Sequence, residues 1–229
     1  MEERSIPRSE MRLYERIGAL LWIPVHVLGL PLLLLLLFPE ISSSSLNFWT
    51  YAVGCSALTL LCLGFLRRDF DRLWEKPLRI LGTAGLGFCV LLLVDALLSA
   101  LFLFILPWNN PNDYALMELL LEDRQRIIVI TAILAPILEE LMFRGGVFGL
   151  LRRKSRAAAY VLCMLLFALY HTWQYALEDP IYWLYLIQYL PAGFLLCLAY
   201  ERTECIWTPI FLHMLNNGIS LMAMLKAGG

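Results

Sequence analysis

Ionisable and amide side chains interrupt three apolar stretches in the second half of this 229-residue chain. A charge near the centre of a lipid bilayer costs roughly 2.5 to 3.5 kcal/mol on insertion scales, so residues of this kind need partners and usually have a function. Two carboxylates, a guanidinium, two imidazoles and an amide together suit acid–base chemistry on a bound molecule. The residues concerned are Glu139, Glu140, Arg144, His171, His213 and Asn217.

The spacing of the first three residues assigns them different roles. Glu140 and Arg144 are four residues apart, so on a helix they share a face and can form an ion pair. Glu139 is rotated about 100° from Glu140 around the same helix. We therefore predict a supporting ion pair between Glu140 and Arg144, and a free catalytic carboxylate on Glu139.

Hydrolysis of a peptide bond needs a base that activates water and donors that stabilise the developing oxyanion. Glu139 with His171 can activate the water. His213 and Asn217 are also four residues apart, and their shared helix face can present two donors to the carbonyl oxygen. The pattern predicts Glu139, His171, His213 and Asn217 as catalytic residues.

Two alternatives remain for the water-activating group. Glu139, His171 and His213 make a three-ligand zinc set with an open coordination position. The same residues also suffice for water activation without a metal, and we favour that alternative because His213 and Asn217 form a natural oxyanion pair. No cofactor is certain from the sequence, and zinc stays open.

The composition requires a lipid environment. Hydrophobic residues make up 60% of the chain, charged residues only 16%, and the mean hydropathy is +0.70, which is too apolar for an ordinary soluble domain. The 18 basic and 19 acidic residues nearly balance, so the chain lacks the cationic surface that nucleic acid requires. The lipid bilayer is the expected partner, and nucleic acid is excluded.

The apolar stretches predict an all-α, polytopic membrane bundle of about seven transmembrane helices, because a span needs about 20 apolar residues. Residues 112–126 predict a short interfacial amphipathic helix. We expect one membrane domain, 1–229, with N-terminal helices in 1–126 and the motif-bearing helices in 127–229. The predicted spans are 17–38, 47–66, 80–106, 127–149, 157–177, 181–200 and 205–225.

Basic residues predict the orientation, since short cytoplasmic loops collect Lys and Arg. They cluster in the N-terminal segment, between the second and third spans, between the fourth and fifth, and at Arg202. The alternate connections hold only Arg124 and Arg126, with Lys226 near the far end. We expect a multi-pass protein of the inner (plasma) membrane with a cytoplasmic N-terminus.

Three short motifs, in order along the chain, resemble the CAAX protease and bacteriocin-processing family of membrane proteases, also called the Abi family. The first is E-E-x-x-x-R at Glu139, the second is F-x-x-x-H ending at His171, and the third is H-x-x-x-N beginning at His213. The resemblance covers roughly residues 127–229. It implies a glutamate-dependent endopeptidase, a hydrolase that acts on a membrane-associated protein or peptide.

Other functions remain as alternatives. A non-catalytic immunity or scaffolding protein could keep the same fold and bind a partner. A small transporter with Glu139 as a proton relay ranks last, because the chain has no visible repeat symmetry. We interpret His26 as a helix-packing or interfacial residue. Tyr170, Trp173 and Gln188 near the motifs could line a substrate path, but we favour aromatic packing.

Overall fold

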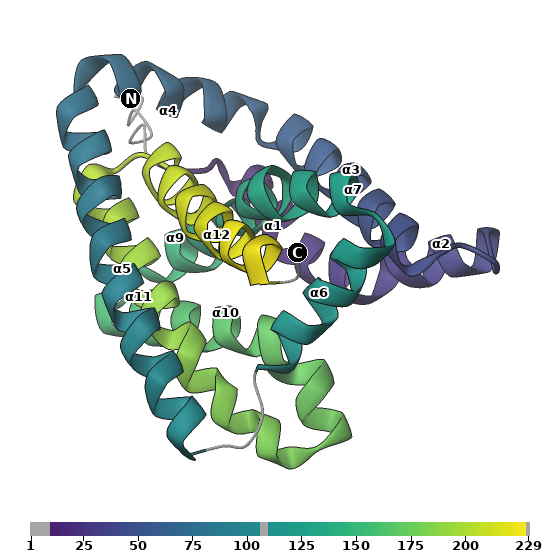
Figure 1. Ribbon diagram of the computed structural model, residues 1–229. Coiled ribbons are helices and arrows are strands. Elements are labelled where there is room, and N and C mark those ends of the chain that lie inside the picture. The colour runs from purple at the N-terminus through teal and green to yellow at the C-terminus, as the bar shows by residue number, and fades with distance from the viewer. Residues whose placement is uncertain (1–9, 106–109, 228–229) are drawn as a thin grey trace.

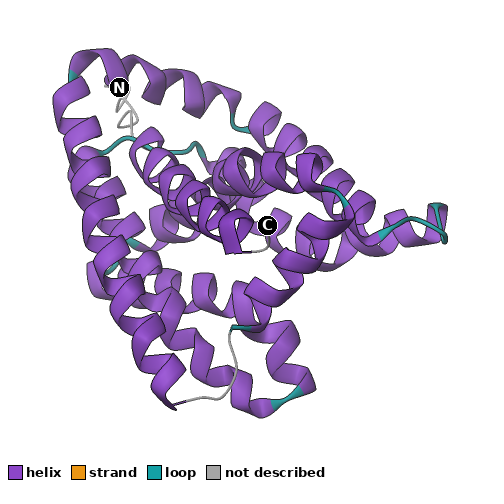
Figure 2. Cartoon of the chain, viewed as in Figure 1, coloured by secondary structure: helices purple, strands orange, loops and turns teal. Residues whose placement is uncertain are grey.

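The computed structural model describes residues 10–105 and 110–227, and within these ranges every regular element is a helix (Figure 2). The predicted all-α membrane bundle is therefore confirmed as a fold class. Figure 1 shows the C-terminal helix α12 (Trp207–Ala227) crossing the middle of the molecule, with the other helices arranged around it.

The first apolar stretch is one continuous helical rod of 25 residues, from Leu13 to Leu37. It consists of α1 (Leu13–Pro24), a π-helical turn η1 (Val25–Gly29) and α2 (Leu30–Leu37). Every side chain of α2 is at least partly exposed, and α2 projects from the body of the molecule (Figure 1). Seven of its eight residues are leucine, and an exposed apolar surface of this kind marks a membrane or protein contact.

The second predicted span, 47–66, does not fit one straight helix. The structure has α3 (Ser43–Leu61) and α4 (Leu63–Glu75), bent by 80° at Cys62. α4 carries basic and acidic residues along one side, so a straight continuation would place them in the hydrocarbon region. In Figure 1, α4 leads instead to the long helix α5 (Pro77–Ile105).

The predicted interfacial segment forms two helices, α6 (Pro111–Glu122) and α7 (Arg124–Val129). Asn110 and Asp123 cap them, because their side chains accept hydrogen bonds from the backbone amides of Asn112 and Arg126. The Glu122 carboxylate accepts bonds from both the amide and the hydroxyl of Ser44, which fastens α6 to α3. Hydrogen bonding to Ser42 and Ser44 lowers the pKa of Glu122.

The helical segment from 124 to 151 carries the first motif and is irregular. After α7 it runs through η2 (Ile130–Leu134), α8 (Ala135–Glu140), η3 (Leu141–Phe148) and α9 (Gly149–Leu151), where η2 and η3 are π-helical. π-helical turns are often found at functional sites. All eight residues of η3 are buried, and η3 packs against α1, α10 and α11, so it forms the centre of the core.

The C-terminal half is completed by α10 (Arg156–Glu178), a 3₁₀ turn η4 (Pro180–Tyr185), α11 (Leu186–Thr203) and α12. Ser155 and Asp179 cap α10 and η4 with their side-chain oxygens. Glu204 adopts a left-handed conformation with φ of 52°. This residue ends α11 and lets the chain turn back into α12.

In the described part of the chain, four helices are long and apolar enough to cross a membrane, or five if the bent pair α3–α4 is one span. The four are Leu13–Leu37, Pro77–Ile105, Arg156–Glu178 and Pro180–Thr203. Segments 127–149 and 205–225 are helical but contain the motif residues, which make them more polar. The count of seven spans is not confirmed and stays a prediction.

Helices α10 and α11 approach each other closely at Gly193. A Cβ atom at this position would lie 3.0 Å from Cα and 3.4 Å from the carbonyl oxygen of Met164. Small residues allow helix backbones to approach in this way within membranes. The carbonyl oxygen of Gly193 also accepts a hydrogen bond of 3.2 Å from Nη2 of Arg144, so the close approach also positions the first motif.

We expect Gly193→Ala to lower the free energy of unfolding by about 1 to 3 kcal/mol, because the backbones of α10 and α11 must separate. Denaturant unfolding in detergent micelles measures this change. Gly85→Ala on α5 is the matched control, since a Cβ atom there has no neighbour within 4 Å. Equal stability of the two variants would contradict the close-packing interpretation.

Candidate active site

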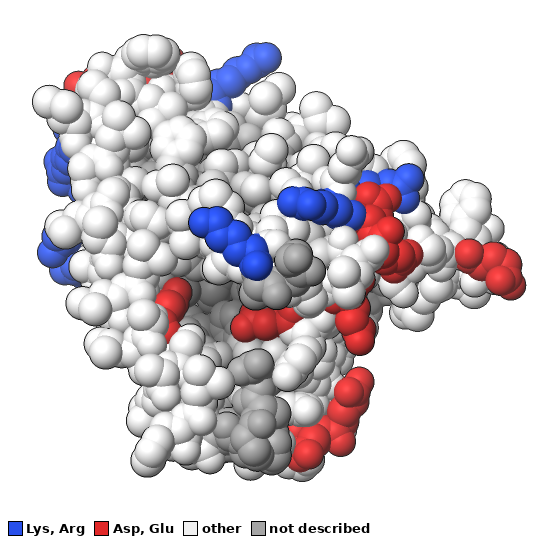
Figure 3. Space-filling view, viewed as in Figure 1, with Lys and Arg blue, Asp and Glu red and all other residues white. Residues whose placement is uncertain are grey.

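A cavity of 530 Å³ lies among the helices and is lined by residues from both halves of the chain. Glu139, His171 and Asn217 are on its wall, as is His26 from the first helical rod. On the face shown in Figure 3, acidic side chains border a hollow in the surface, and Asp95 and Asp113 are among the lining residues of the cavity. The motif residues therefore meet a space that can hold part of a second molecule.

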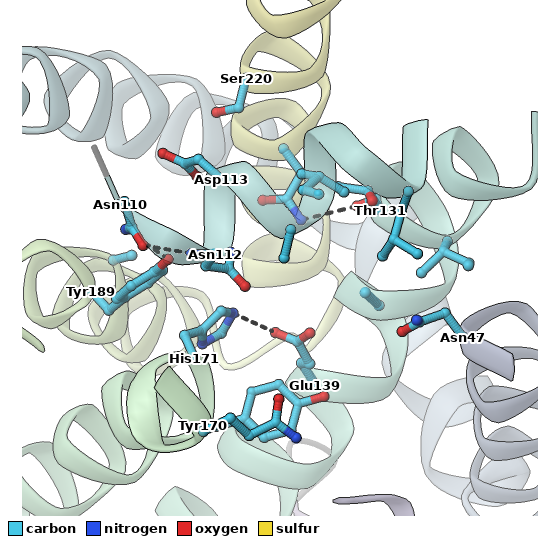
Figure 4. A pocket seen from close by; sticks show the side chains of 18 of the residues that line it. Asn47, Asn110, Asn112, Asp113, Thr131, Glu139, Tyr170, His171, Tyr189 and Ser220 are labelled. Atoms are coloured by element: carbon cyan, nitrogen blue, oxygen red, sulfur yellow. Dashed lines mark hydrogen bonds and ion pairs between the residues drawn. The ribbon is translucent and has the colours of Figure 1, made fainter. Parts of the chain in front are cut away.

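Two imidazoles from different helices face the Glu139 carboxylate. Nε2 of His171, on α10, lies 3.7 Å from Oε2 of Glu139, as Figure 4 shows. Nε2 of His213, on α12, lies 3.9 Å from the same oxygen. This Glu139 oxygen is buried and has no hydrogen-bond partner among the described residues. A water placed beside such a pair of atoms can hydrogen-bond to both of them.

The second nitrogen of each imidazole is already engaged. Nδ1 of His171 is 2.9 Å from the carbonyl oxygen of Phe167, and Nδ1 of His213 is 2.8 Å from Oε1 of Glu140. Both oxygens only accept hydrogen bonds, so both Nδ1 atoms carry a hydrogen and donate it. Each ring is thereby fixed with its Nε2 atom directed at Glu139.

Glu140 and Arg144 form a completely buried ion pair. Nη1 of Arg144 donates to Oε1 of Glu140 at 3.0 Å, and both side chains are 0% exposed. The Arg144 guanidinium also lies over the Phe167 ring, 4.4 Å from its centroid, where the π-electrons attract a cation. Because the same Glu140 oxygen holds His213, the ion pair orients an imidazole of the site.

Asn217 lies on the cavity wall, one turn beyond His213 on α12. Its Nδ2 donates a hydrogen bond of 2.9 Å to the carbonyl oxygen of Thr131 in η2, which Figure 4 labels. The structure thus brings His171 and His213 to the Glu139 carboxylate, and Asn217 lines the cavity that Glu139 and His171 also line. Their catalytic roles remain predictions.

The zinc alternative does not fit these atoms as they stand. Ligands at about 2.0 to 2.1 Å from a tetrahedral zinc ion lie about 3.3 Å from one another, whereas the two Nε2 atoms are 3.7 and 3.9 Å from the Glu139 oxygen. Among the described residues, no three His, Cys, Asp or Glu side chains are gathered closely enough to hold a metal ion. No step proposed below passes through a metal.

Residues outside the three motifs complete the cavity. The sequence interpretation missed most of them, but it named Tyr170 and Gln188 and favoured packing for both. The hydroxyl groups of Tyr51 and Tyr170 are 3.0 Å apart, and Nδ2 of Asn110 donates to Gln188 at 2.8 Å. Helix α6, which we predicted as an interfacial amphipathic helix, supplies Asn112 and Asp113 to the lining. No motif in the sequence marks these residues.

Two comparisons with known proteins agree with the motif pattern. The family model described as "Type II CAAX prenyl endopeptidase Rce1-like" matches residues 125–219, which include all three motifs. The chain is also 26% identical over 180 residues to "Putative membrane peptidase YdiL" of Bacillus subtilis (strain 168), across 76% of this chain and 69% of that protein. No solved structure gives a significant match.

Arg144→Leu should lower the free energy of unfolding by roughly 3 to 5 kcal/mol, because it leaves the buried Glu140 carboxylate without its cation. The double variant Arg144→Leu with Glu140→Leu should lose less than the two single variants combined. Unfolding of the four proteins in micelles forms a double-mutant cycle. A coupling free energy near zero would show that the ion pair does not contribute to stability.

Proposed function

We propose that this chain, which belongs to the CAAX protease and bacteriocin-processing family of membrane proteases, is a glutamate-dependent endopeptidase. It hydrolyses a peptide bond of a membrane-associated protein or peptide. The observation that carries the proposal is the convergence of two Nε2 atoms, 3.7 and 3.9 Å away, on the unpartnered Oε2 of Glu139. Separate helices supply the carboxylate and the two imidazoles, and Glu139 lines the cavity.

The attacking water binds between Glu139 and His171. Glu139 Oε2 and His171 Nε2 both accept hydrogen bonds in this state, and their 3.7 Å separation lets one water donate to each of them. The water oxygen attacks the substrate carbonyl carbon while Glu139 takes one water proton. A new C–O bond forms, and the carbonyl electron pair moves to the oxygen.

His213 and Asn217 stabilise the resulting oxyanion. This role requires a hydrogen on both ring nitrogens of His213, because Nδ1 is already engaged with Glu140. His213 then donates from Nδ1 to Glu140 and from Nε2 to the oxyanion. Asn217 has a second amide hydrogen beyond the one bound to Thr131, and it donates that hydrogen to the same oxygen.

Collapse of the tetrahedral intermediate breaks the C–N bond. The leaving nitrogen takes the proton that Glu139 received from water, and His171 relays it across the gap between them. The products are a new carboxyl terminus and a new amino terminus, and the site returns to its starting charge.

We further propose that the protein lies in the inner membrane of the cell with its N-terminus in the cytoplasm, as the distribution of basic residues indicates.

Glu139→Gln should reduce cleavage at least a thousandfold, because the amide cannot accept the water proton. The experiment compares the membrane proteomes of cells that contain the native chain or the variant, and reads newly formed protein termini. Termini present only with the native chain are expected. Identical termini, with both proteins folded and equally abundant, would favour the non-catalytic scaffold.

Removal of metals should leave cleavage unchanged, because water activation in this proposal depends on protein groups alone. The measurement pairs elemental analysis of the purified protein with the rate of appearance of Glu139-dependent termini after strong chelation. One tightly bound zinc ion per chain, with activity lost on chelation and restored by zinc, would establish the metal alternative.

A further inference from the structure

His26 is a buried imidazole in the first helical rod that the proposed reaction does not use. His26 is only 3% exposed, yet it lines the same cavity as Glu139 and His171. It lies in η1, the π-helical turn that begins directly after Pro24. Turns of this kind place side chains out of the regular helical register, often at functional sites.

The inner edge of the His26 ring packs closely against Gly54 of α3. Nδ1 of His26 is buried without a hydrogen-bond partner, and so is Nε1 of Trp22, one turn earlier. A Cβ atom at Gly54 would lie 3.0 Å from Nδ1 of His26 and 3.5 Å from Nε1 of Trp22. The ring edge therefore packs directly on the Gly54 backbone, with no room for a water beside Nδ1. An unpaired buried N–H is less tolerated than an unpaired acceptor, so Nδ1 is the bare acceptor nitrogen.

That arrangement leaves the hydrogen of His26 on Nε2. A neutral imidazole has one donor and one acceptor nitrogen, so an Nδ1 atom that accepts requires an Nε2 atom that donates. His26 has no hydrogen bond to another described residue, and Nε2 is not among the buried unpartnered atoms. The Nε2–H group of His26 is therefore available to a molecule in the cavity.

Hydroxyl groups of α3 and α10 extend the same wall. The hydroxyl of Thr50 is buried without a partner, and Thr50 and Tyr51 both line the cavity. The Tyr51 ring packs edge-on against His26 with centroids 4.7 Å apart, and its hydroxyl pairs with Tyr170 at 3.0 Å. In Figure 4, Tyr170 lies close to Glu139, so this wall adjoins the reacting carboxylate.

We propose that His26, Thr50 and the Tyr51–Tyr170 hydroxyl pair form a subsite that binds the main chain of the substrate peptide beside the bond to be cleaved. An extended peptide entering an apolar cavity must pair each backbone N–H and C=O. Nε2–H of His26 binds a substrate carbonyl oxygen. The Thr50 hydroxyl is buried as the site stands. Threonine in a helix has two favoured rotamers, and rotation about the Cα–Cβ bond turns the hydroxyl to the cavity that Thr50 lines, where it accepts from a substrate amide. The occupant is a polypeptide in extended form, bound through its backbone and independently of its side chains.

This inference rests on the proposed function, and it differs from a packing role in what substitution should do. His26→Phe keeps an aromatic ring against Tyr51 but removes the donor, whereas His26→Gln keeps a donor and loses the ring. A backbone-binding residue tolerates Gln better than Phe, and a packing residue tolerates Phe better than Gln.

The test uses a random-sequence mixture of quenched-fluorescent peptides with the protein in lipid nanodiscs. For His26→Phe we expect KM to rise about three- to tenfold with kcat changed less than twofold, as loss of one hydrogen bond predicts. His26→Gln should stay within about twofold of the native KM. A His26→Phe protein with native KM, whether or not its kcat is lowered, would overturn the subsite.

A threonine pair on α3 supplies a matched control. Thr50→Val should raise KM in the same way as His26→Phe. Thr59→Val changes the same group on the same helix, but Thr59 lies against Cys55 with its hydroxyl 3.9 Å from the Cys55 sulfur and is not part of the cavity wall. Equal effects of the two valine substitutions would also overturn the subsite.

The Glu139→Gln protein separates failure of the subsite from failure of the proposed function. Retention of the same peptides by this variant is measured in equilibrium dialysis, with and without His26→Phe. Weaker retention with His26→Phe supports the subsite even if no peptide is cleaved, and unchanged retention overturns it. Cleavage by Glu139→Gln at the native rate would instead overturn the proposed catalytic role of Glu139.

Discussion

A buried guanidinium paired with a single carboxylate is the constraint on which the rest of this structure depends. An unpaired charge in an apolar interior is so unfavourable that Arg144 must have its partner on the same helix, and Glu140 supplies it. The pair is fully enclosed by η3 and its neighbours, including the Phe167 ring and the Gly193 carbonyl group. Helices α10 and α11 must therefore approach closely around this point.

From that ion pair follows the geometry of the site. Glu140 has one oxygen that receives both Arg144 and His213, so the position of α12 is linked to the position of η3. Glu139, one residue earlier, is turned away from the pair and towards the cavity. The structure thus separates two adjacent carboxylates into one that stabilises the fold and one that is free to act as a base.

The distribution of polarity is the reverse of that in a soluble enzyme. Large apolar side chains are exposed along α2 and α5, for example Leu36, Leu78 and Phe104 at 79%, 87% and 91%, while hydroxyl, amide and imidazole groups line the internal cavity. Lipid covers the first set. The second set creates a polar interior in which water and a peptide backbone can bind.

The sequence predicted the all-helical membrane fold well, because lipid requires long apolar helices and leaves a clear hydropathy signal. It also predicted which motif residues would converge, since charges within such helices are rare and need partners. The bend at Cys62 was not predicted, because the apolar pattern ends gradually there.

The cavity wall was harder to predict. His26 was interpreted as packing because its place on the cavity wall depends on helices distant in sequence. Tyr51, Asn110 and Asp113 gave no signal for a similar reason, since single polar residues are common in any membrane protein. Only the folded arrangement shows that these residues share one space.

The central claim is that Glu139 removes a proton from water and does not itself attack the substrate. A single turnover in ¹⁸O-labelled water, followed by mass spectrometry of both the product and the protein, tests it most directly. We predict one ¹⁸O atom in the new carboxyl terminus and none in the Glu139 side chain. An ¹⁸O atom in Glu139, or a product without the label, would contradict the account.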